Sequence, residues 1–330
     1  MSMKAMVYKK YGSPDVFEIA KLKRPQIKSN EILIKVHYTT VTTADVRLRS
    51  LNVPKGFGLI IRLVQGLTKP RKQLLGSDFS GEVVAVGNNV KEFVTGDKVF
   101  GSSKTGTYAE FTVLKDNGTI TKIPDNISLE EAASLPFGAM TSLTFLRDLG
   151  ELKQGQKLLI NGASGSLGTN AIQMAKMYGA HITAICSGKN TELVKSLGAD
   201  EVIDYTKEDY LKSGKKYDII YDTLGIISPK ESLSMLNEGG RHLMAVSTIP
   251  QYFDIFKLSM TQRKKIKAGM AIFNKNNIET IAEFVINGKL KPVIDKTFKL
   301  EDIEEAHRYV DMGHKVGSVV INIEKDYIEL

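Results

Sequence analysis

The sequence predicts an α/β protein with two parts, a β-rich first domain and a doubly wound parallel sheet. Strand-like alternation of apolar and polar residues, broken by turn signals, fills most of residues 1–125. From Ser128 onward the apolar spacing becomes helical, and short apolar runs alternate with the helices as far as Ile286. A glycine motif at residues 162–168 lies within this second part. The order of strand, helix and strand favours parallel strands joined by right-handed crossovers.

The first domain is predicted from alternating segments and from the turns between them. Residues 31–38 and 81–87 alternate as half-buried strands do, and turn signals such as Gly96-Asp97 separate segments of this kind. Residues 50–75 do not have a strand pattern, because apolar residues there are interspersed with basic ones. They predict a short helical excursion, which either packs on the domain or covers an active site.

The glycine motif has the context of a dinucleotide-binding turn. Residues 157–161 are an apolar run typical of a buried strand, and residues 167–178 carry apolar side chains at helical spacing. Between them, Gly162 permits a tight turn, Gly165 lets the backbone approach a pyrophosphate, and Gly168 lets the helix lie close to the strand. The alternative is a purely structural turn, since this spacing departs from the common G-x-G-x-x-G pattern.

The residues between these glycines are expected to bind the phosphates of the nucleotide. A helix N-terminus presents free N–H groups and the positive end of the helix dipole to anions. The predicted contacts at this turn are Ser164, Ser166 and Leu167, together with the three glycines.

The remaining elements complete a Rossmann sheet. A capping-box pattern of Ser128 and Glu131 opens its first helix. We expect strands at 157–161, 182–186, 201–203, 217–224 and 241–247, with a sixth at 264–272, and helices at 128–135, 141–149, 167–178, 191–197, 229–236 and 278–286. Gly239-Gly240 is expected to stop the helix before the fifth strand. Residues 292–299 and 317–323 return to strand patterns and are expected to rejoin the first domain.

The segment after the second Rossmann strand indicates NADPH rather than NADH. NAD-binding units place an acidic residue about 20 positions after the motif, where it binds the ribose 2′-hydroxyl. No Asp or Glu occurs between Thr169 and Thr191; the strand end carries Ser187 and Lys189 instead. A hydroxyl and an ammonium group can bind a 2′-phosphate that a carboxylate would repel. The alternative is that Lys189 is an ordinary surface lysine.

Composition excludes several other classes of protein. The net charge of +8 is spread over short basic clusters at residues 21–24, 69–72, 212–216 and 263–267, which does not suggest a nucleic-acid-binding face. No apolar run approaches the roughly 20 residues of a membrane span, so no membrane partner is expected. Cys186 is the single cysteine, which excludes an internal disulfide and a multi-cysteine zinc site. Without a signal-peptide pattern at the N-terminus, a cytoplasmic location is expected.

Several further segments match the motifs of one family in order. Residues 75–87 and 93–101 match its catalytic-domain signature, and residues 108–110, 132–136, 288–295 and 305–308 follow. On these motifs the chain resembles the medium-chain dehydrogenase/reductase superfamily, and most of all its zinc-free, zeta-crystallin-like quinone oxidoreductase branch. The resemblance implies a GroES-like catalytic domain (1–125 and 288–330), a Rossmann NADP-binding domain (126–287) and a cleft between them.

The resemblance also implies roles for particular residues. It puts Thr42 and Thr43 near the nicotinamide, where they would orient the ligand rather than transfer a proton, although a packing role is open for each. The remaining positions that it assigns to the cofactor are Thr141, Tyr205 near the adenosine, and Ala245 and Val246 near the nicotinamide amide. Family members commonly form homodimers through the edge of the Rossmann sheet, which here would be residues 264–272.

Departures from the zinc-dependent members define the expected chemistry. Thr42 and Asp78-Phe79 stand where those enzymes carry a catalytic cysteine and a His-Glu pair, so no metal is expected. Without a metal ion, the expected reaction is hydride transfer from NADPH to a small-molecule quinone or α,β-unsaturated carbonyl compound. The competing hypothesis is an NADPH-binding sensor or structural protein with incidental turnover.

Overall fold

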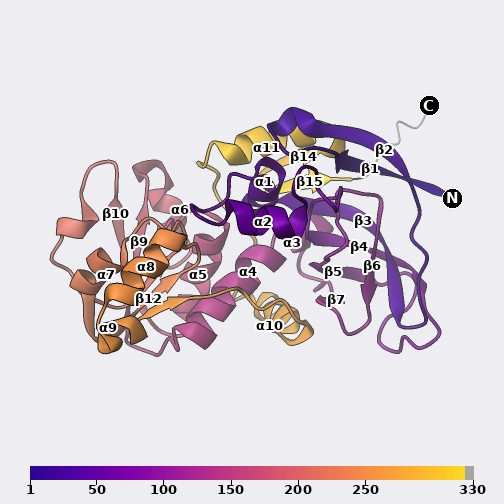
Figure 1. The fold of residues 1–330 in the computed structure, drawn as a ribbon. Helices are drawn as coiled ribbons and strands as arrows, with labels where there is room; N and C mark the ends of the chain where they lie inside the picture. Colours follow the sequence, from indigo (N-terminus) through magenta and orange to yellow (C-terminus); the bar gives the residue numbers. More distant parts are fainter. Residues whose placement is uncertain (324–330) are drawn as a thin grey trace. The chain divides into compact units, whose positions relative to one another are not determined.

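The computed structural model describes residues 1–323, which form two compact units (Figure 1). Within the described residues, unit 1 comprises residues 1–53, 59–137 and 273–323, and unit 2 comprises residues 54–58 and 138–272. The domain boundaries expected near residues 126 and 287 therefore fall inside unit 1. One contact that joins the two expected domains is the hydrogen bond from Ser318 Oγ to Ser134 O (2.9 Å).

Unit 1 is built on a mixed sheet and a separate antiparallel pair of strands. The sheet has the order β14-β15-β3-β4-β5-β7, with β6 also paired to β3. Its strands are β3 (Glu31–Val41), β4 (Asp78–Val86), β5 (Lys98–Ser102), β6 (Phe111–Lys115), β7 (Ile120–Lys122), β14 (Ile294–Lys299) and β15 (Ser318–Asn322), and the pair is β1 (Ser2–Tyr8) and β2 (Phe17–Lys23). As the strand patterns predict, the C-terminal strands rejoin the first sheet, because β15 pairs with β3.

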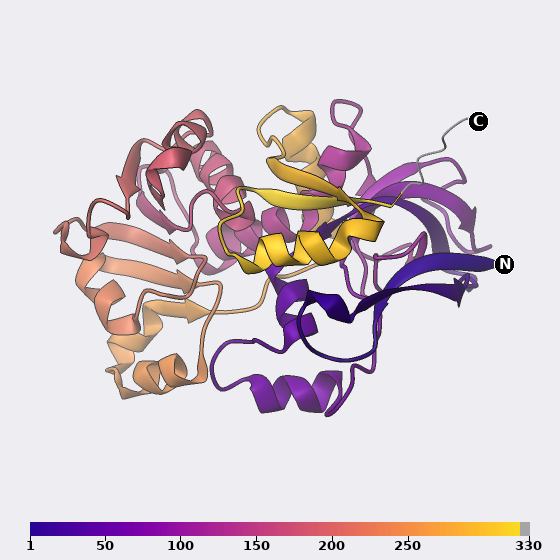
Figure 2. The same cartoon turned by 90° about the horizontal axis from the view of Figure 1, so that it is seen from above.

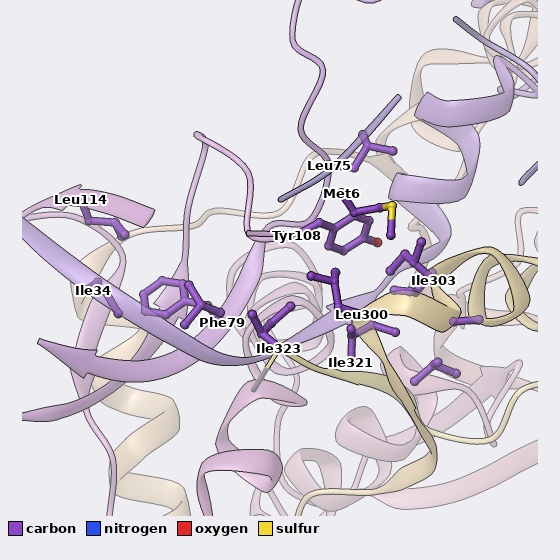
Figure 3. Packing of buried hydrophobic residues seen from close by; sticks show 14 of the residues in the cluster. Met6, Ile34, Leu75, Phe79, Tyr108, Leu114, Leu300, Ile303, Ile321 and Ile323 are labelled. Carbon is purple, nitrogen blue, oxygen red and sulfur yellow. The ribbon is translucent and has the colours of Figure 1, made fainter. Parts of the chain in front are cut away.

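Some of the helices of unit 1 pack on this sheet, and the others lie beside it. They are α1 (Thr43–Ser50), α2 (Gly58–Gln65, which begins at the last residue of the 54–58 segment), α3 (Leu129–Ala133), α10 (Lys275–Ile286) and α11 (Ile303–Asp311), with 3₁₀ turns η1 (Pro14–Val16) and η5 (Leu300–Asp302). Figure 2 shows α11, in yellow, lying along β14 and β15. Figure 3 shows the core between these elements, where Met6, Phe79, Tyr108 and Ile303 pack together.

Helix α1 lies in a region for which the sequence predicted strands. The signal for it was present as Thr42 and Asp45, which have the spacing of a capping box. In the structure the Asp45 amide donates to the Thr42 hydroxyl and the Asp45 carboxylate accepts from the Thr42 amide.

Unit 2 contains a parallel sheet of six strands within the described residues. Its order is β10-β9-β8-β11-β12-β13, the 3-2-1-4-5-6 arrangement of a dinucleotide-binding sheet. The strands are β8 (Lys157–Asn161), β9 (His181–Cys186), β10 (Glu201–Asp204), β11 (Tyr217–Asp222), β12 (Leu236–Met244) and β13 (Ile266–Ala268). The expected doubly wound sheet is therefore present, and its strand order reverses between β8 and β11.

The helices of unit 2 connect these strands. They are α4 (Pro136–Leu143, whose first two residues belong to unit 1), α5 (Ser166–Met177), α6 (Thr191–Ser196), α7 (Pro229–Met235), α8 (Ile249–Lys257) and α9 (Met260–Lys264), with the π-helical turn η2 (Thr144–Leu149) and 3₁₀ turns η3 (Gly188–Asn190) and η4 (Tyr210–Lys212). Among residues 1–323, none of the helices combines the length and apolarity needed to cross a membrane.

Two expected elements of unit 2 differ in extent. The expected strand at 264–272 is only the three-residue β13, because a capping box of Ser259 and Gln262 opens α9 immediately before it. Gly239 and Gly240 lie within β12 instead of stopping α7. Gly239 has φ +74°, and the pairing of β11 with β12 shifts register beside it, so the glycines accommodate an irregularity in the strand.

Candidate functional site

Two of the three glycines in the motif are required by the packing of unit 2 itself. Gly162 has φ +79°, and a Cβ there would lie 2.4 Å from Thr223 Oγ1. A Cβ on Gly168 would lie 2.4 Å from Gly162 O and 2.5 Å from the Ala163 Cα. Helix α5 thus approaches the turn after β8 too closely for any side chain, as the motif predicts.

Gly165 differs from these two glycines, because the chain around it leaves room for a side chain. Its φ of −78° suits any residue, and the nearest atom to an added Cβ would be Gly162 O at 3.6 Å. The first bond within α5 runs from Thr169 N to Gly165 O, so the N–H groups of the first turn point out of the helix. Open space at a helix N-terminus fits the pyrophosphate of a dinucleotide.

Helix α4 places an unsatisfied hydroxyl beside α5. Gly138 packs so tightly that an added Cβ would lie 2.4 Å from Ser166 Oγ, and Ser142 Oγ donates to Leu167 O (2.8 Å). Thr141, one turn after Gly138, is buried, and its Oγ1 has no hydrogen-bond partner in the described part of the chain. A buried hydroxyl without a partner is costly, so this atom fits a bound ligand that supplies one.

The loop after β11 is fixed at the point where the strand order reverses. Asp222 is fully buried, and burial raises the pKa of its carboxyl group. The carboxylate accepts hydrogen bonds from Asn161 Nδ2 (2.9 Å) and from the backbone N–H groups of Leu224 (3.1 Å), Gly225 (3.0 Å) and Ile227 (2.9 Å). Ligands of open α/β sheets bind at this point, and Asp222 shapes its wall.

The predicted nicotinamide-side residues border the same loop. Ala245 follows β12, and its N–H donates to Asp222 O (3.0 Å). A Cβ on Gly225 would lie 2.6 Å from Val246 O. The glycine turn, the loop after β11 and residues 245–246 therefore meet at the carboxyl edge of the parallel sheet.

The loop after β9 brings together two serines predicted to contact the cofactor. Asn190 Nδ2 lies within hydrogen-bond distance of both Ser164 Oγ (3.0 Å) and Ser187 Oγ (3.3 Å). Lys189 is exposed, and no ion pair or hydrogen bond engages its amine in residues 1–323. Asn190, which links the serines, was missed because an amide carries no motif signal.

Asp204 is an acidic residue that the sequence argument missed. A Cβ on Gly188 would lie 2.4 Å from Asp204 Oδ2, so a carboxylate borders the loop that carries Lys189. The N–H (3.0 Å) and hydroxyl (2.7 Å) of Thr206 donate to Asp204 Oδ1, and the hydroxyl bond lowers the pKa of Asp204 most. The parallel pairing of β10 with β9 brings the carboxylate there, because Asp204 stands opposite Cys186, and no motif along the chain signals this. Tyr205, the next residue, is half-exposed.

In unit 1 the two candidate threonines have different environments. Thr42 is buried, and its hydroxyl donates to Asp45 Oδ2 (2.5 Å) and accepts from Asp45 N. The other oxygen of Asp45 accepts from Gly76 N (3.0 Å), which fixes α1 to the turn before β4. Thr43, the first residue of α1, is exposed. Thr42 is therefore a capping residue, while the side chain of Thr43 faces solvent.

The positions that carry zinc ligands in related enzymes do not fit a metal ion here. Phe79 lies in the hydrophobic core, and the Thr42 hydroxyl is engaged by Asp45. Asp78 is buried and accepts from Phe137 N (2.9 Å) and Thr40 Oγ1 (3.3 Å). No group of three or more His, Cys, Asp and Glu side chains in residues 1–323 could hold a metal ion.

Asp78 should make the stability of the protein depend on pH. Burial, helped by the nearby charge of Asp45, raises the pKa of Asp78 from 3.8 to about 8. Across this window the folded chain retains a proton that the unfolded chain releases, so the free energy of unfolding falls as pH rises. The slope approaches about 1.4 kcal/mol per pH unit, the value for one proton.

Asp78→Asn removes the charge but keeps an oxygen for Phe137 N–H. We expect this variant to gain stability over the wild type as pH rises from 3.8 to about 8, with the difference constant at higher pH. Urea unfolding across this window measures it. Parallel curves for the two proteins would show that Asp78 does not bind the extra proton.

The chain is similar to known proteins over most of its length. Family models match an alcohol dehydrogenase GroES-like domain over residues 28–125 and a zinc-binding dehydrogenase over residues 197–321. The mitochondrial NAD(P)H oxidoreductase RTN4IP1 of Mus musculus is 34% identical over 97% of this chain and 89% of its own length. The 2-methylene-furan-3-one reductase of Solanum lycopersicum is 30% identical over 97% of this chain and 79% of its own.

A solved structure has the same fold over nearly the whole chain. The quinone oxidoreductase from Coxiella burnetii superposes with a TM-score of 0.86 at 28% identity, covering 98% of this chain and 100% of that one. Its fold agrees with the parallel sheet described above, and the match to RTN4IP1 spans most of both chains. The chain belongs to the medium-chain dehydrogenase/reductase superfamily of NAD(P)H-dependent oxidoreductases, in its quinone oxidoreductase branch.

Proposed function

We propose that this protein uses NADPH to reduce a quinone or an α,β-unsaturated carbonyl compound without a metal ion. The observation that carries the proposal is the free space at Gly165, a glycine that the chain itself does not need. The names of the related quinone oxidoreductase and 2-methylene-furan-3-one reductase support the substrate class. The side chains of Thr42, Asp78 and Phe79, which do not suit zinc, support metal-free chemistry.

In the proposed reaction the chain binds and orients its ligands. The first turn of α5 binds the pyrophosphate, and the Thr141 hydroxyl gains a partner from the cofactor. Bound NADPH supplies a hydride to an acceptor that is already electrophilic. Thr43 donates a hydrogen bond to the acceptor's oxygen, Thr42 holds the start of α1 in place, and water protonates the resulting enolate.

The proposed function is tested by following NADPH oxidation with a panel of quinones and enones, in the presence of a chelator. We expect turnover with members of this panel and none with simple alcohols and NADP⁺. Tight NADPH binding without turnover on any acceptor would instead support the sensor or structural protein. Loss of activity on removal of a stoichiometric metal would contradict metal-free chemistry.

Lys189 is proposed to set the preference for NADPH. Its amine has no partner in the described residues, and a charge-assisted contact to the 2′-phosphate contributes roughly 1.5–3 kcal/mol. We therefore expect Lys189→Ala to weaken NADPH binding by about 10- to 150-fold and to leave NADH binding nearly unchanged. Titration of both cofactors measures this. An equal effect on both would place Lys189 away from the phosphate.

Replacing Asp204 is the matched control for Lys189→Ala, because it removes a negative charge and should have the opposite effect on the cofactor preference. Its carboxylate borders the same loop, with only Lys207 Nζ (3.7 Å) as a nearby ion-pair partner in the described chain. Asp204→Asn removes a charge that would repel a 2′-phosphate, so the ratio of NADPH to NADH affinity should rise. A fall in that ratio would contradict the assignment of the 2′-phosphate to this loop.

A homodimer through β13 is also proposed. This strand lies at one edge of the parallel sheet, which is the surface that family members commonly use. The flanking Arg263, Lys264 and Lys265 would limit pairing beyond two chains. The mass in solution tests the proposal.

A further inference from the structure

Helix α2 exposes its apolar side to solvent, the reverse of an ordinary surface helix. Leu59 and Leu63 are 66% and 54% exposed, and Ile60 and Val64 are 47% and 63% exposed. These four side chains lie on one face of the helix, and Leu67 (56%) follows it.

The polar side of the segment attaches it to unit 1. Arg62 Nη1 donates to Leu67 O (2.8 Å), and its guanidinium lies over the Tyr11 ring at 5.9 Å. The Tyr11 hydroxyl donates to Gly66 O (2.9 Å). Gly66 has φ +126°, and a Cβ there would lie 2.0 Å from Lys69 O. These contacts fix the helix with its apolar face outward.

The charged residues of the segment that contains α2 all have one sign. Between Asp45 and Asp78 the chain has no acidic residue and seven basic ones. Four of the basic residues belong to the helix or to the loop that follows it, and all four are exposed: Arg62, Lys69, Arg71 and Lys72. An apolar face flanked by cations is the pattern of a helix that lies in the interface of an anionic membrane.

We propose that residues 59–72 dock on the surface of a bilayer that contains anionic lipids. The apolar side chains of α2 would enter the boundary between headgroups and acyl chains, and the basic residues would contact lipid phosphates. This departs from the expectation of no membrane partner, which considered only membrane-spanning segments. A helix lying in the interface is a different class, because only one face leaves water.

Charge and size favour a lipid surface over a second copy of the chain. Two copies meeting at this face would bring two basic loops together, and like charges oppose that contact. Five apolar side chains are also far fewer than the roughly 20–30 residues that each side of a standard protein interface contributes. A bilayer needs no matching shape and supplies the opposite charge.

The test measures binding of the full chain to vesicles, without reference to reductase activity. We expect the protein to float with vesicles of phosphatidylcholine and phosphatidylserine, to bind pure phosphatidylcholine poorly, and to be released by high salt. The triple variant Leu59→Asn, Leu63→Asn, Val64→Asn and the double variant Lys69→Glu, Lys72→Glu should each lose about tenfold or more in binding. Circular dichroism establishes that each variant is folded.

Matched controls change the same residue types elsewhere on unit 1. Val94, Ile286 and Met312 are exposed apolar residues (61%, 63% and 61%) far from residues 59–72 in sequence, and their replacement by Asn should leave binding unchanged. The same holds for Lys21→Glu with Lys23→Glu. Equal losses in variants and controls, or no binding to anionic vesicles, would overturn the proposal. Self-association that the triple variant abolishes would likewise overturn it and assign the face to a second copy.

Discussion

Replacing Gly165 with valine should leave the protein folded and weaken its binding of NADPH by about 100-fold or more. The Cβ of the new side chain comes no closer than 3.6 Å to any atom of residues 1–323, and the backbone at φ −78° accepts it. The same side chain occupies the space proposed for the pyrophosphate. Loss of two charge-assisted bonds of roughly 1.5–3 kcal/mol each is enough for this effect.

Calorimetric titration of NADPH measures the loss, and circular dichroism with thermal unfolding measures the fold. Gly165→Ala is the graded control, since one methyl group should displace the phosphates less than an isopropyl group. Wild-type affinity in Gly165→Val would mean that no pyrophosphate binds at this turn.

In contrast to Gly165→Val, which should remain folded, Gly168→Ala should lose much of the stability of the protein. Its Cβ would lie 2.4–2.5 Å from backbone atoms of the turn after β8, which cannot rotate away as a side chain could. Forced backbone shifts of this kind cost about 3 kcal/mol. For a unit of this size the Tm should fall by roughly 6–12 °C.

Thermal unfolding of Gly168→Ala beside Gly165→Ala checks the contrast between two glycines of one motif. Gly165→Ala should unfold close to the wild-type Tm. If Gly168→Ala matched it, α5 would not depend on the close approach to Gly162 and Ala163.

The parallel sheet could be predicted from the sequence because the patterns that indicate its strands and helices are local. Each strand is a short apolar run and each helix has its own apolar spacing, so order and type follow without tertiary information. The same logic failed at α1, where residues with weak apolar spacing form a helix that Thr42 and Asp45 cap. It also failed at residues 264–272, where only residues 266–268 form a strand, directly after α9 ends at Lys264.

Candidate site residues could be proposed from the sequence where a motif requires a particular residue type. Residues whose role depends on their neighbours in space could not. Gly162, Gly165 and Gly168 share one motif, yet only their surroundings show that the first and third are required by packing. Asp204 reaches the Lys189 loop across two paired strands, which no spacing along the chain reveals. The engagement of the Thr42 hydroxyl by Asp45 likewise depends on the geometry of a helix end.

The most direct test of the proposed function follows the hydride itself. The protein is incubated with an α,β-unsaturated ketone and NADPH carrying deuterium on one face of the nicotinamide C4, with each face labelled in turn. We predict that deuterium from one face only appears at the β-carbon of the product, with a primary isotope effect on turnover, and that Gly165→Val transfers it far more slowly. NADPH oxidation that brings deuterium into the product from neither face, or no oxidation with any enone or quinone, would contradict the proposed reduction.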